Sequence, residues 1–170
     1  MSAVDRAEIE SAVRAWAKGL YPSEAGVELL IRQGKAIYAR APWIAQHGDY
    51  AVIDVNKLVY EAGAWSGSER RVVAIAASLL SSEHPVNLED AVSGLDRVNL
   101  QLVLAAIAHA NGSHEHSALR RGPDGATVGF EQLSSAFAWP QDASTSGPAR
   151  RRSPAPAEED AGRSTPAPGI

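Results

Sequence analysis

The chain has 170 residues, a net charge of −4 and no cysteine. This length suits one folded domain, and the lack of cysteine excludes disulfides, thiolate metal sites and a cysteine nucleophile. An acidic balance disfavours non-specific nucleic-acid binding, which depends on Lys and Arg neutralising phosphates. The N-terminal residues carry acidic side chains and no apolar signal core, so we expect a cytoplasmic protein without a membrane span.

Two amphipathic helices are predicted at the start of the chain. Apolar residues recur at helical spacing over residues 5–18, where Asp5 and Glu8 have the spacing of a capping box. A second helix is expected over residues 22–40. Gly34 lies inside it at a cost of about 1 kcal/mol relative to Ala, so two shorter helices broken at Gly34 are the alternative.

A turn and a short capped helix are expected next. Pro42 ends the second helix, Trp43 folds back on the core, and residues 46–50 have the composition of a turn. Asp54 is then placed to cap a helix that extends to residue 62.

The clearest start signals lie in the middle of the chain. Ser66 and Glu69 have capping-box spacing and open a helix over residues 66–81 with one broad apolar face. Asn87 is expected to cap a short helix over residues 87–93.

A third helix of this stretch is predicted over residues 96–111, with Asp96 as its cap and Gly112 as its stop signal. Its residues are apolar on nearly every side, which is typical of a buried helix. We therefore expect it to be the central helix of the domain, with Leu104 fully packed.

The C-terminal part is predicted to contain a hairpin and a tail. Residues 114–130 surround a turn rich in Gly, Pro and Asp, which favours a short β-hairpin. Residues 140–170 are rich in Pro, Ala and Ser and cannot bury enough apolar surface to fold, so a disordered tail is expected there. The expected fold is all-α or nearly so, with one domain over residues 3–139.

Two segments resemble parts of ABC-type ATPases. Residues 66–76, which begin Ser-Gly-Ser-Glu, look like the signature helix of that family, and residues 93–96 look like the loop after its Walker B strand. The family's chemistry needs a Gly-rich phosphate loop that ends in Lys-Ser or Lys-Thr, and this chain contains none. Helix-capping signals in front of apolar helices account for the likeness, and no nucleotide hydrolysis is expected.

Three histidines form the best candidate metal site. His109 lies near a helix end, and His114 and His116 would point the same way on a strand. Imidazole groups, with Glu115 beside them, are suitable ligands for Zn²⁺. The spacing matches no established motif, so solvated surface histidines are the preferred interpretation and a metal site is the alternative.

A winged helix-turn-helix is the main functional alternative. Three helices followed by a hairpin come in the order of that fold, and Leu95-Asp96-Arg97 resembles the start of its recognition helix. The resemblance implies a DNA contact through four side chains: Arg97, Gln101, Arg120 and Arg121. The rest of this helix is apolar, whereas a helix that reads a groove must leave a polar face exposed.

No stretch of the sequence has all the residues that a catalytic or cofactor-binding motif requires. Ser, His and Asp are present, but no Gly-x-Ser-x-Gly turn accompanies them. We therefore expect a non-enzymatic helical module without a cofactor, which binds a protein partner or itself. The two other hypotheses are a winged-helix DNA regulator and a histidine-bound metal protein.

Overall fold

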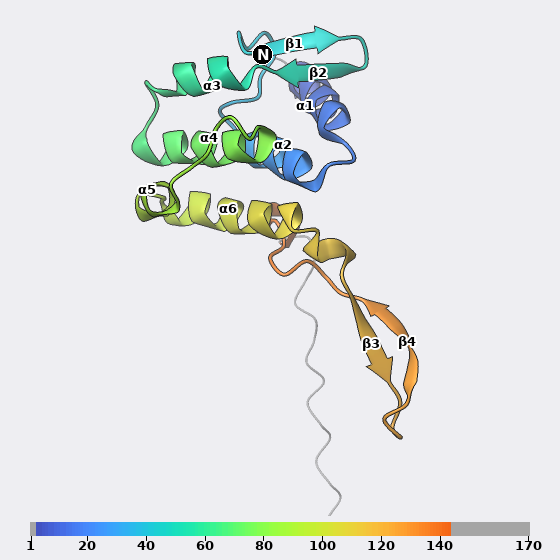
Figure 1. Ribbon diagram of the computed structural model, residues 1–170. Helices are drawn as coiled ribbons and strands as arrows, with labels where there is room; N and C mark the ends of the chain where they lie inside the picture. Colours follow the sequence, from blue (N-terminus) through green and yellow to red (C-terminus); the bar gives the residue numbers. More distant parts are fainter. Residues whose placement is uncertain (1–2, 144–170) are drawn as a thin grey trace, which may run out of the picture.

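The structure, a computed structural model that describes residues 3–143, is built around the helix α2 (Tyr21–Gln33) (Figure 1). Its most extensive contacts are with α4 (Gly67–Leu80), which lies beside it, and with α6 (Arg97–Ala110), which lies below both in Figure 1. Leu29 and Leu30 of α2 are 0% exposed. The core of the domain therefore lies along α2.

The prediction that residues 96–111 form the central helix is wrong. Only the inward side of α6 is buried, through Leu102, Val103 and Ala106, while Leu104 is half-buried. α6 is the last helical layer on its side of the domain, and the short α5 (Leu88–Ser93) lies beside its N-terminal end (Figure 1). An apolar composition cannot bury a helix face when no neighbouring layer covers that face.

The opposite layer contains the helices α1 (Ala3–Ala17) and α3 (Val55–Ala62) and the antiparallel strands β1 (Ile44–His47) and β2 (Tyr50–Ile53) (Figure 1). In the register, Ile44 pairs with Ile53, and β2 packs against α1. The turn expected at residues 46–50 is shorter in the structure. Residues 48–49 link the two strands, and the flanking residues belong to β1 and β2.

Most of the predicted helix starts are confirmed. Each cap accepts a hydrogen bond from a backbone N–H of the first turn, which satisfies a group that has no partner inside the helix. Ser66 and Glu69 form the complete capping box. The other side-chain caps are Asp54 for α3, Asn87 for α5 and Asp96 for α6. Asp5 is different, because α1 already begins at Ala3 and Asp5 lies inside its first turn.

The single helix preferred over residues 22–40 is also wrong. α2 ends at Gln33, and Gly34 adopts a φ of 87°, a left-handed conformation that glycine reaches without strain. The following segment turns back into the core, where the buried indole N–H of Trp43 donates a 2.9 Å hydrogen bond to the Ala36 carbonyl. The alternative with a break at Gly34 is correct for the break and for the inward position of Trp43, but the second helix that it expected does not form, because residues 35–43 are not helical.

The predicted C-terminal hairpin is confirmed as β3 (Ser117–Arg121) and β4 (Thr127–Gln132), which follow the 3₁₀ turn η1 (Ser113–Glu115). The hairpin projects away from the helical layers, beyond the C-terminal end of α6 (Figure 1). With two two-stranded sheets, the fold is mostly helical and not strictly all-α. No helix within residues 3–143 is long and apolar enough to cross a membrane.

The helix α7 (Pro140–Ala143) lies beyond the domain boundary expected at residue 139. Its Asp142 forms an ion pair with Arg32 of α2, at 3.1 Å, so the domain includes at least this helix. The remaining part of the predicted tail, residues 144–170, lies outside the described residues.

Candidate functional site

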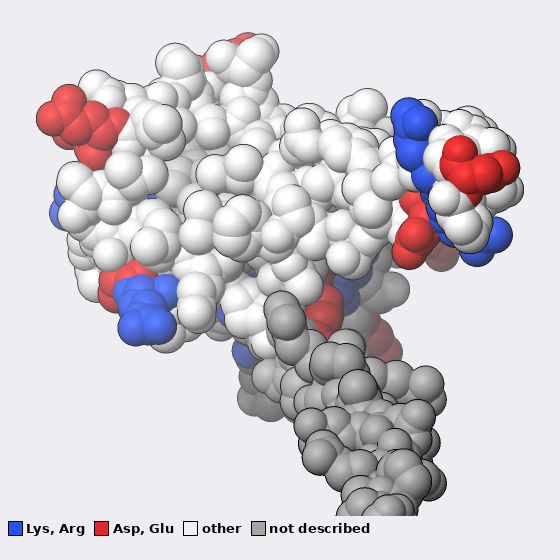
Figure 2. Space-filling model, turned by 90° about the horizontal axis from the view of Figure 1, so that it is seen from below, with Lys and Arg blue, Asp and Glu red and all other residues white. Residues whose placement is uncertain are grey.

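The outward side of α6 is apolar and largely open in the described part of the chain. Leu100, Leu104 and Ile107 follow at spacings of four and three residues, which sets them on one side of a helix. Leu100 is 38% exposed and Ile107 is 48% exposed. Figure 2 views this side of the molecule, and its middle is a broad surface without Lys, Arg, Asp or Glu.

Phe137 extends this surface from the segment between β4 and α7. Its side chain is 54% exposed. Together with Leu104, Gln101, Ala138 and Pro140 it lines a shallow hollow of about 360 Å³. We call Leu100, Leu104, Ile107 and Phe137 the α6 face.

A second exposed apolar group lies at the N-terminal end of α6. Leu88 and Val92 are one turn apart on α5, and Val98 lies in the first turn of α6; all three are exposed. Glu89 and Asp90 of α5 are exposed beside them. We call these five residues the α5 end.

The β3–β4 hairpin carries a third exposed apolar group. Leu119 and Phe130 lie directly opposite each other in the register and are 53% and 78% exposed. Arg121, two positions after Leu119, is exposed, as is Arg120 between them. The hairpin therefore combines an apolar pair with two cations.

The four residues expected to contact DNA do not form one basic surface. Arg97 and Gln101 are exposed in the first two turns of α6, whereas Arg120 and Arg121 follow its C-terminal end. α6 ends at Ala110, so about 14 Å of helix follows Gln101 before the chain leaves α6 towards the hairpin arginines. The apolar α6 face occupies that interval.

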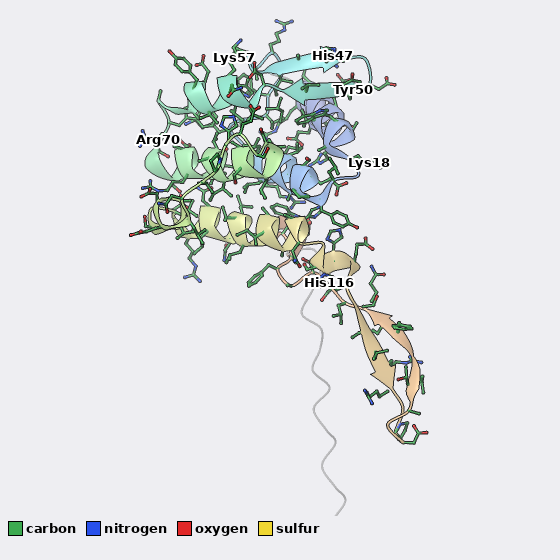
Figure 3. All side chains as sticks on the ribbon, in the orientation of Figure 1. Lys18, His47, Tyr50, Lys57, Arg70 and His116 are labelled. Carbon is green, nitrogen blue, oxygen red and sulfur yellow. The ribbon has the colours of Figure 1, made fainter. Side chains whose placement is uncertain are left out.

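Two of the three predicted metal ligands come together. The rings of His109 and His114 stack with centroids 4.5 Å apart and an interplanar angle of 23°. His116 is exposed at the start of the hairpin (Figure 3). Stacked rings direct their nitrogens alongside each other and not towards a common point, and no group of three or more metal-ligating side chains exists within residues 3–143. The predicted three-histidine arrangement is therefore not formed.

The two histidines instead line a pocket of about 430 Å³, together with Trp139. His109 Nε2 lies 3.1 Å from Glu24 Oε2, and the edge of Tyr21 contacts the His114 ring at 5.0 Å between centroids. The backbone N–H of Gly19 donates to Glu24 and, with His109, holds the pKa of the Glu24 carboxyl below its ordinary value, although burial opposes this shift.

The other wall of this pocket is a network of ion pairs. Glu28 accepts hydrogen bonds from Arg14 at 2.8 Å and from Arg32 at 2.6 Å. Burial raises the pKa of the Glu28 carboxyl, but these two guanidinium groups outweigh it and keep the pKa below its ordinary value. The Arg32 guanidinium also lies 4.8 Å from the ring centroid of Trp139. The charges of the pocket pair with one another and fasten the C-terminal segment to α2.

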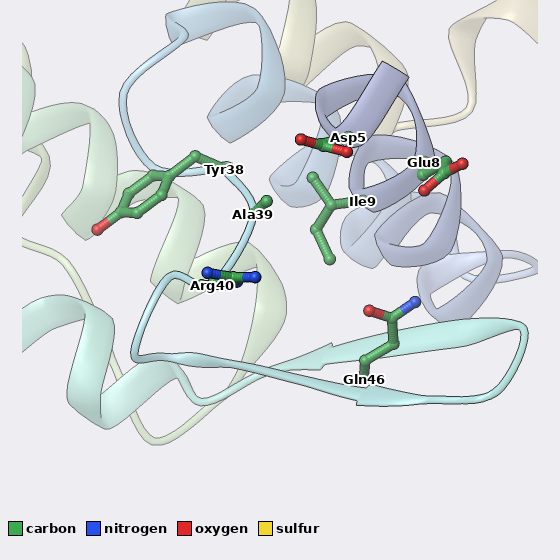
Figure 4. A pocket seen from close by; sticks show the side chains of 7 residues that line it. All are labelled: Asp5, Glu8, Ile9, Tyr38, Ala39, Arg40 and Gln46. Carbon is green, nitrogen blue, oxygen red and sulfur yellow. The ribbon is translucent and has the colours of Figure 1, made fainter. Parts of the chain in front are cut away.

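A larger and more polar pocket, of about 650 Å³, lies between α1, residues 38–40 and β1. The side chains of Asp5, Ile9, Arg40 and Gln46 approach it from these three elements (Figure 4). Arg40 has a φ of 64°, which is uncommon for a residue with a side chain. Two carboxylates, those of Asp5 and Glu8, oppose its one cation, so the pocket has no clear preference for an anion.

The segments that resemble ABC-type ATPases have a structural explanation. Ser68 Oγ donates a 2.7 Å hydrogen bond to Asp96 Oδ2 and accepts one from Asn99 Nδ2 at 2.9 Å. The Asn99 N–H and the Ser68 hydroxyl lower the pKa of the Asp96 carboxyl. These residues join the N-terminal ends of α4 and α6, a role that requires no nucleotide.

Sequence reasoning missed the α6 face because an all-apolar helix normally indicates burial. The available signals in the sequence were Phe137 next to the predicted tail and the break in helical order after Gly112, and neither identifies an uncovered face. Comparisons with protein-family models, with curated proteins and with solved structures find no match to this chain.

Proposed function

We propose that this chain is a non-enzymatic interaction module that binds protein through the α6 face. The observation that carries the proposal is the open row of Leu100, Leu104 and Ile107 with Phe137 beside it. Single exposed apolar residues are ordinary on protein surfaces, whereas a contiguous apolar patch is characteristic of interaction sites.

The composition of the α6 face also fits a protein partner. The core of a protein interface is depleted in charged residues and enriched in aromatic ones. Phe137 supplies an aromatic anchor next to a hollow, and Gln101 is the polar residue at its edge. A partner that inserts an apolar side chain into this hollow would remove Leu104 and Phe137 from water.

A site-specific photo-crosslink tests the proposal. The photo-reactive residue benzoylphenylalanine replaces Ile107 on the α6 face in one variant and Tyr60 on α3 in a control variant. Tyr60 is 81% exposed and lies in a different layer, so it reports background collisions. We expect position 107 to give a discrete protein adduct in cells, identified by mass spectrometry, and position 60 to give none. Equal adducts at both positions, or none at either, would contradict the proposal.

A winged-helix DNA contact is the second candidate. The order α4, α5, α6 and then the β3–β4 hairpin matches the order of that fold, and Arg120 and Arg121 are exposed on the hairpin. Phosphate contacts by two arginines give weak and salt-sensitive affinity.

We expect any DNA affinity at low salt to disappear when Arg120 and Arg121 are both replaced by Ala. Fluorescence anisotropy with duplexes of unrelated sequence measures this, with Arg70→Ala on α4 as the control for loss of one exposed cation. Tight binding to one sequence that resists salt would favour this second candidate over the protein interface.

A further inference from the structure

We propose that the pocket lined by His109, His114 and Trp139 binds a small, uncharged aromatic molecule, and that the His114 ring pairs with a hydrogen-bonding group of this ligand. The pocket shares no lining residue with the α6 face. The inference therefore goes beyond the proposed function, and either one can hold if the other fails.

The pocket lies where four parts of the described chain meet. It is lined by Arg14 of α1, Val27 of α2, His109 of α6 and Trp139 of the C-terminal segment. Val27 is 1% exposed, so the pocket extends inward to the core. Its volume of about 430 Å³ lies in the range of about 300–1,000 Å³ that is usual for small-molecule sites. The pocket is therefore large enough for one ligand of modest size.

The guanidinium groups in the pocket wall are already paired. Arg14 Nε and Arg32 Nε donate to Glu28 at 2.8 Å and 2.6 Å. The two terminal nitrogens of Arg32 donate to the Asp142 carboxylate, both at 3.1 Å. An anionic ligand would have to displace one of these carboxylates or leave its own charge close to Glu28. An anion is therefore not the preferred ligand.

The carboxylate of Glu24 is also paired. Its Oε1 accepts a 2.8 Å hydrogen bond from the Gly19 N–H, and its Oε2 lies 3.1 Å from His109 Nε2. The aromatic face that would attract a cation is taken as well, because the Arg32 guanidinium lies 4.8 Å from the Trp139 ring centroid. A charge that enters a partly buried site without a partner loses hydration and gains no attraction in return. The pocket therefore favours an uncharged ligand.

The accessible wall of the pocket is mostly apolar, and rings supply part of it. His109 and His114 stack with centroids 4.5 Å apart, and the Trp139 ring lies 6.4 Å from His109 at a tilt of 48°. Aromatic rings gain from stacked and edge-on contacts beyond the burial of their area. A ligand with one ring or two fused rings therefore suits this wall.

His114 supplies a polar group that has no partner among the described residues. Its Nδ1 is buried and accepts or donates no hydrogen bond within residues 3–143. Its Nε2 lies 3.9 Å from Glu115 Oε1, which is too far for a hydrogen bond. A buried nitrogen without a partner is costly, whereas a half-turn of the ring would keep its stack on His109 and turn this nitrogen to the opposite edge. A ligand N–H or O–H at the pocket wall would then satisfy it.

Three probes that share an indole ring and have nearly the same size test the ligand class. Near neutral pH, indole-3-carboxamide is uncharged, indole-3-carboxylate is an anion and tryptamine is a cation. Each probe is titrated into the full chain labelled with ¹⁵N, and NMR follows the indole N–H signals of the 4 tryptophans. A Trp139→Phe variant identifies the signal of Trp139.

We expect indole-3-carboxamide to shift the Trp139 signal with a dissociation constant of about 1 mM or lower, an affinity within reach of a ligand of this size. The signals of Trp16, Trp43 and Trp65 should stay in place, because these residues do not line the pocket. The two charged probes should bind about tenfold or more weakly, since each brings a charge that finds no free partner.

A pair of matched variants tests the role of His114. His114→Phe keeps a flat ring on His109 and removes both ring nitrogens, so it should weaken the binding of indole-3-carboxamide about three- to tenfold, the effect of one hydrogen bond. His116→Phe is the control and should leave the affinity unchanged, because His116 is exposed and does not line the pocket. The probe series uses the original chain, so it decides the ligand class even if a variant fails to fold.

Other outcomes overturn the inference in distinguishable ways. If no probe shifts the Trp139 signal, or if all the tryptophan signals shift equally, a specific pocket is excluded. Tighter binding of the carboxylate or of tryptamine would show that the wall charges are free to pair, which excludes an uncharged ligand class. Equal affinity in His114→Phe and in the original chain excludes the hydrogen bond to His114. The crosslink at position 107 tests the proposed function separately from all of these results.

Discussion

At the scale of the residue, Glu28 is the centre of an ion-pair network on α2. It lies between Arg14 of α1 and Arg32 of α2, and Arg32 in turn pairs with Asp142 of α7. Three elements are therefore connected through one partly buried carboxylate. An arginine left without its carboxylate in such a place is costly, because desolvation is no longer offset by attraction.

We predict that Glu28→Gln lowers the free energy of unfolding by about 1–3 kcal/mol at pH 7, the cost of breaking charge-assisted hydrogen bonds at a partly buried site. The folded-state pKa of Glu28 lies below the ordinary value of 4.5. The carboxylate therefore stabilises the fold above that value, and its contribution is lost as the pH falls through the lower, folded-state pKa.

Denaturant unfolding at pH 7 and at several values below pH 4.5 measures this effect. The difference between Glu28→Gln and the original chain should shrink with acidification. Glu61→Gln, an exposed carboxylate of α3, is the matched control and should have little effect at pH 7. If Glu28→Gln lowered the free energy of unfolding by the same amount at all pH values, packing and not charge would be responsible.

At the scale of the element, the contact between α2 and α4 depends on a glycine. A Cβ atom added to Gly26 would lie 2.9 Å from Leu80 Cγ and 3.1 Å from the Ala76 carbonyl oxygen. The carbonyl belongs to the backbone of α4 and cannot move without moving the helix. Gly26 therefore allows these two helices to approach closely.

We predict that Gly26→Ala destabilises the domain by about 1–3 kcal/mol, the usual cost of forcing an extra group into a packed interior. The higher helix propensity of Ala favours the opposite sign by about 1 kcal/mol at an open helical position. Thermal and denaturant unfolding decide between the two signs, with Ala15→Gly on α1 reporting propensity at an exposed helical position. Stabilisation by Gly26→Ala would show that α4 yields to the added methyl group.

The identity of the central helix gives a second prediction at this scale. Leu30→Ala in α2 should cost about 2–5 kcal/mol, because it leaves a cavity in the core. Leu104→Ala in α6 should lower the free energy of unfolding by distinctly less. Leu104 is half-buried, so part of its side chain already contacts solvent and its removal leaves a smaller cavity. Denaturant unfolding of the two variants side by side measures the difference. An equal or larger loss of unfolding free energy in Leu104→Ala would indicate that α6 and not α2 is the core helix.

At the scale of the whole molecule, the C-terminal segment crosses back over the helical layers. Trp139 contacts His109 and Arg32, Ser135 Oγ lies 3.2 Å from Ser113 Oγ, and Asp142 pairs with Arg32. These contacts fasten the segment that carries Phe137. The α6 face therefore depends on residues far apart in the sequence.

We predict that a chain ending at residue 143 unfolds cooperatively within a few degrees of the full chain. A chain ending at residue 138 loses Trp139 and Asp142, and it should be less stable by about 2 kcal/mol through lost burial and cation–π contact. Thermal unfolding followed by circular dichroism compares the three lengths. Loss of cooperativity in the chain ending at 143 would mean that residues 144–170 take part in the fold.

The sequence by itself determined the local features. The caps at Ser66, Asn87 and Asp96 each form with a backbone N–H two or three residues away, so neighbours in the chain are sufficient to define them. The β3–β4 hairpin was predictable for the same reason, because its turn residues lie between its strands.

Only the tertiary structure decided which apolar surfaces are buried. The end of α2 was open from the sequence: Gly34 was either tolerated inside one helix or its stop, and the packing of residues 36–43, with Trp43 buried, decides for the stop. The strands β1 and β2 depend on packing against α1, which precedes them by a whole helix. α6 is apolar on nearly all sides, but burial depends on the neighbouring layers, and the position of α2 leaves the α6 face outside the core. The same holds for His109 and His114, which the turn at Gly112 stacks against each other and away from His116.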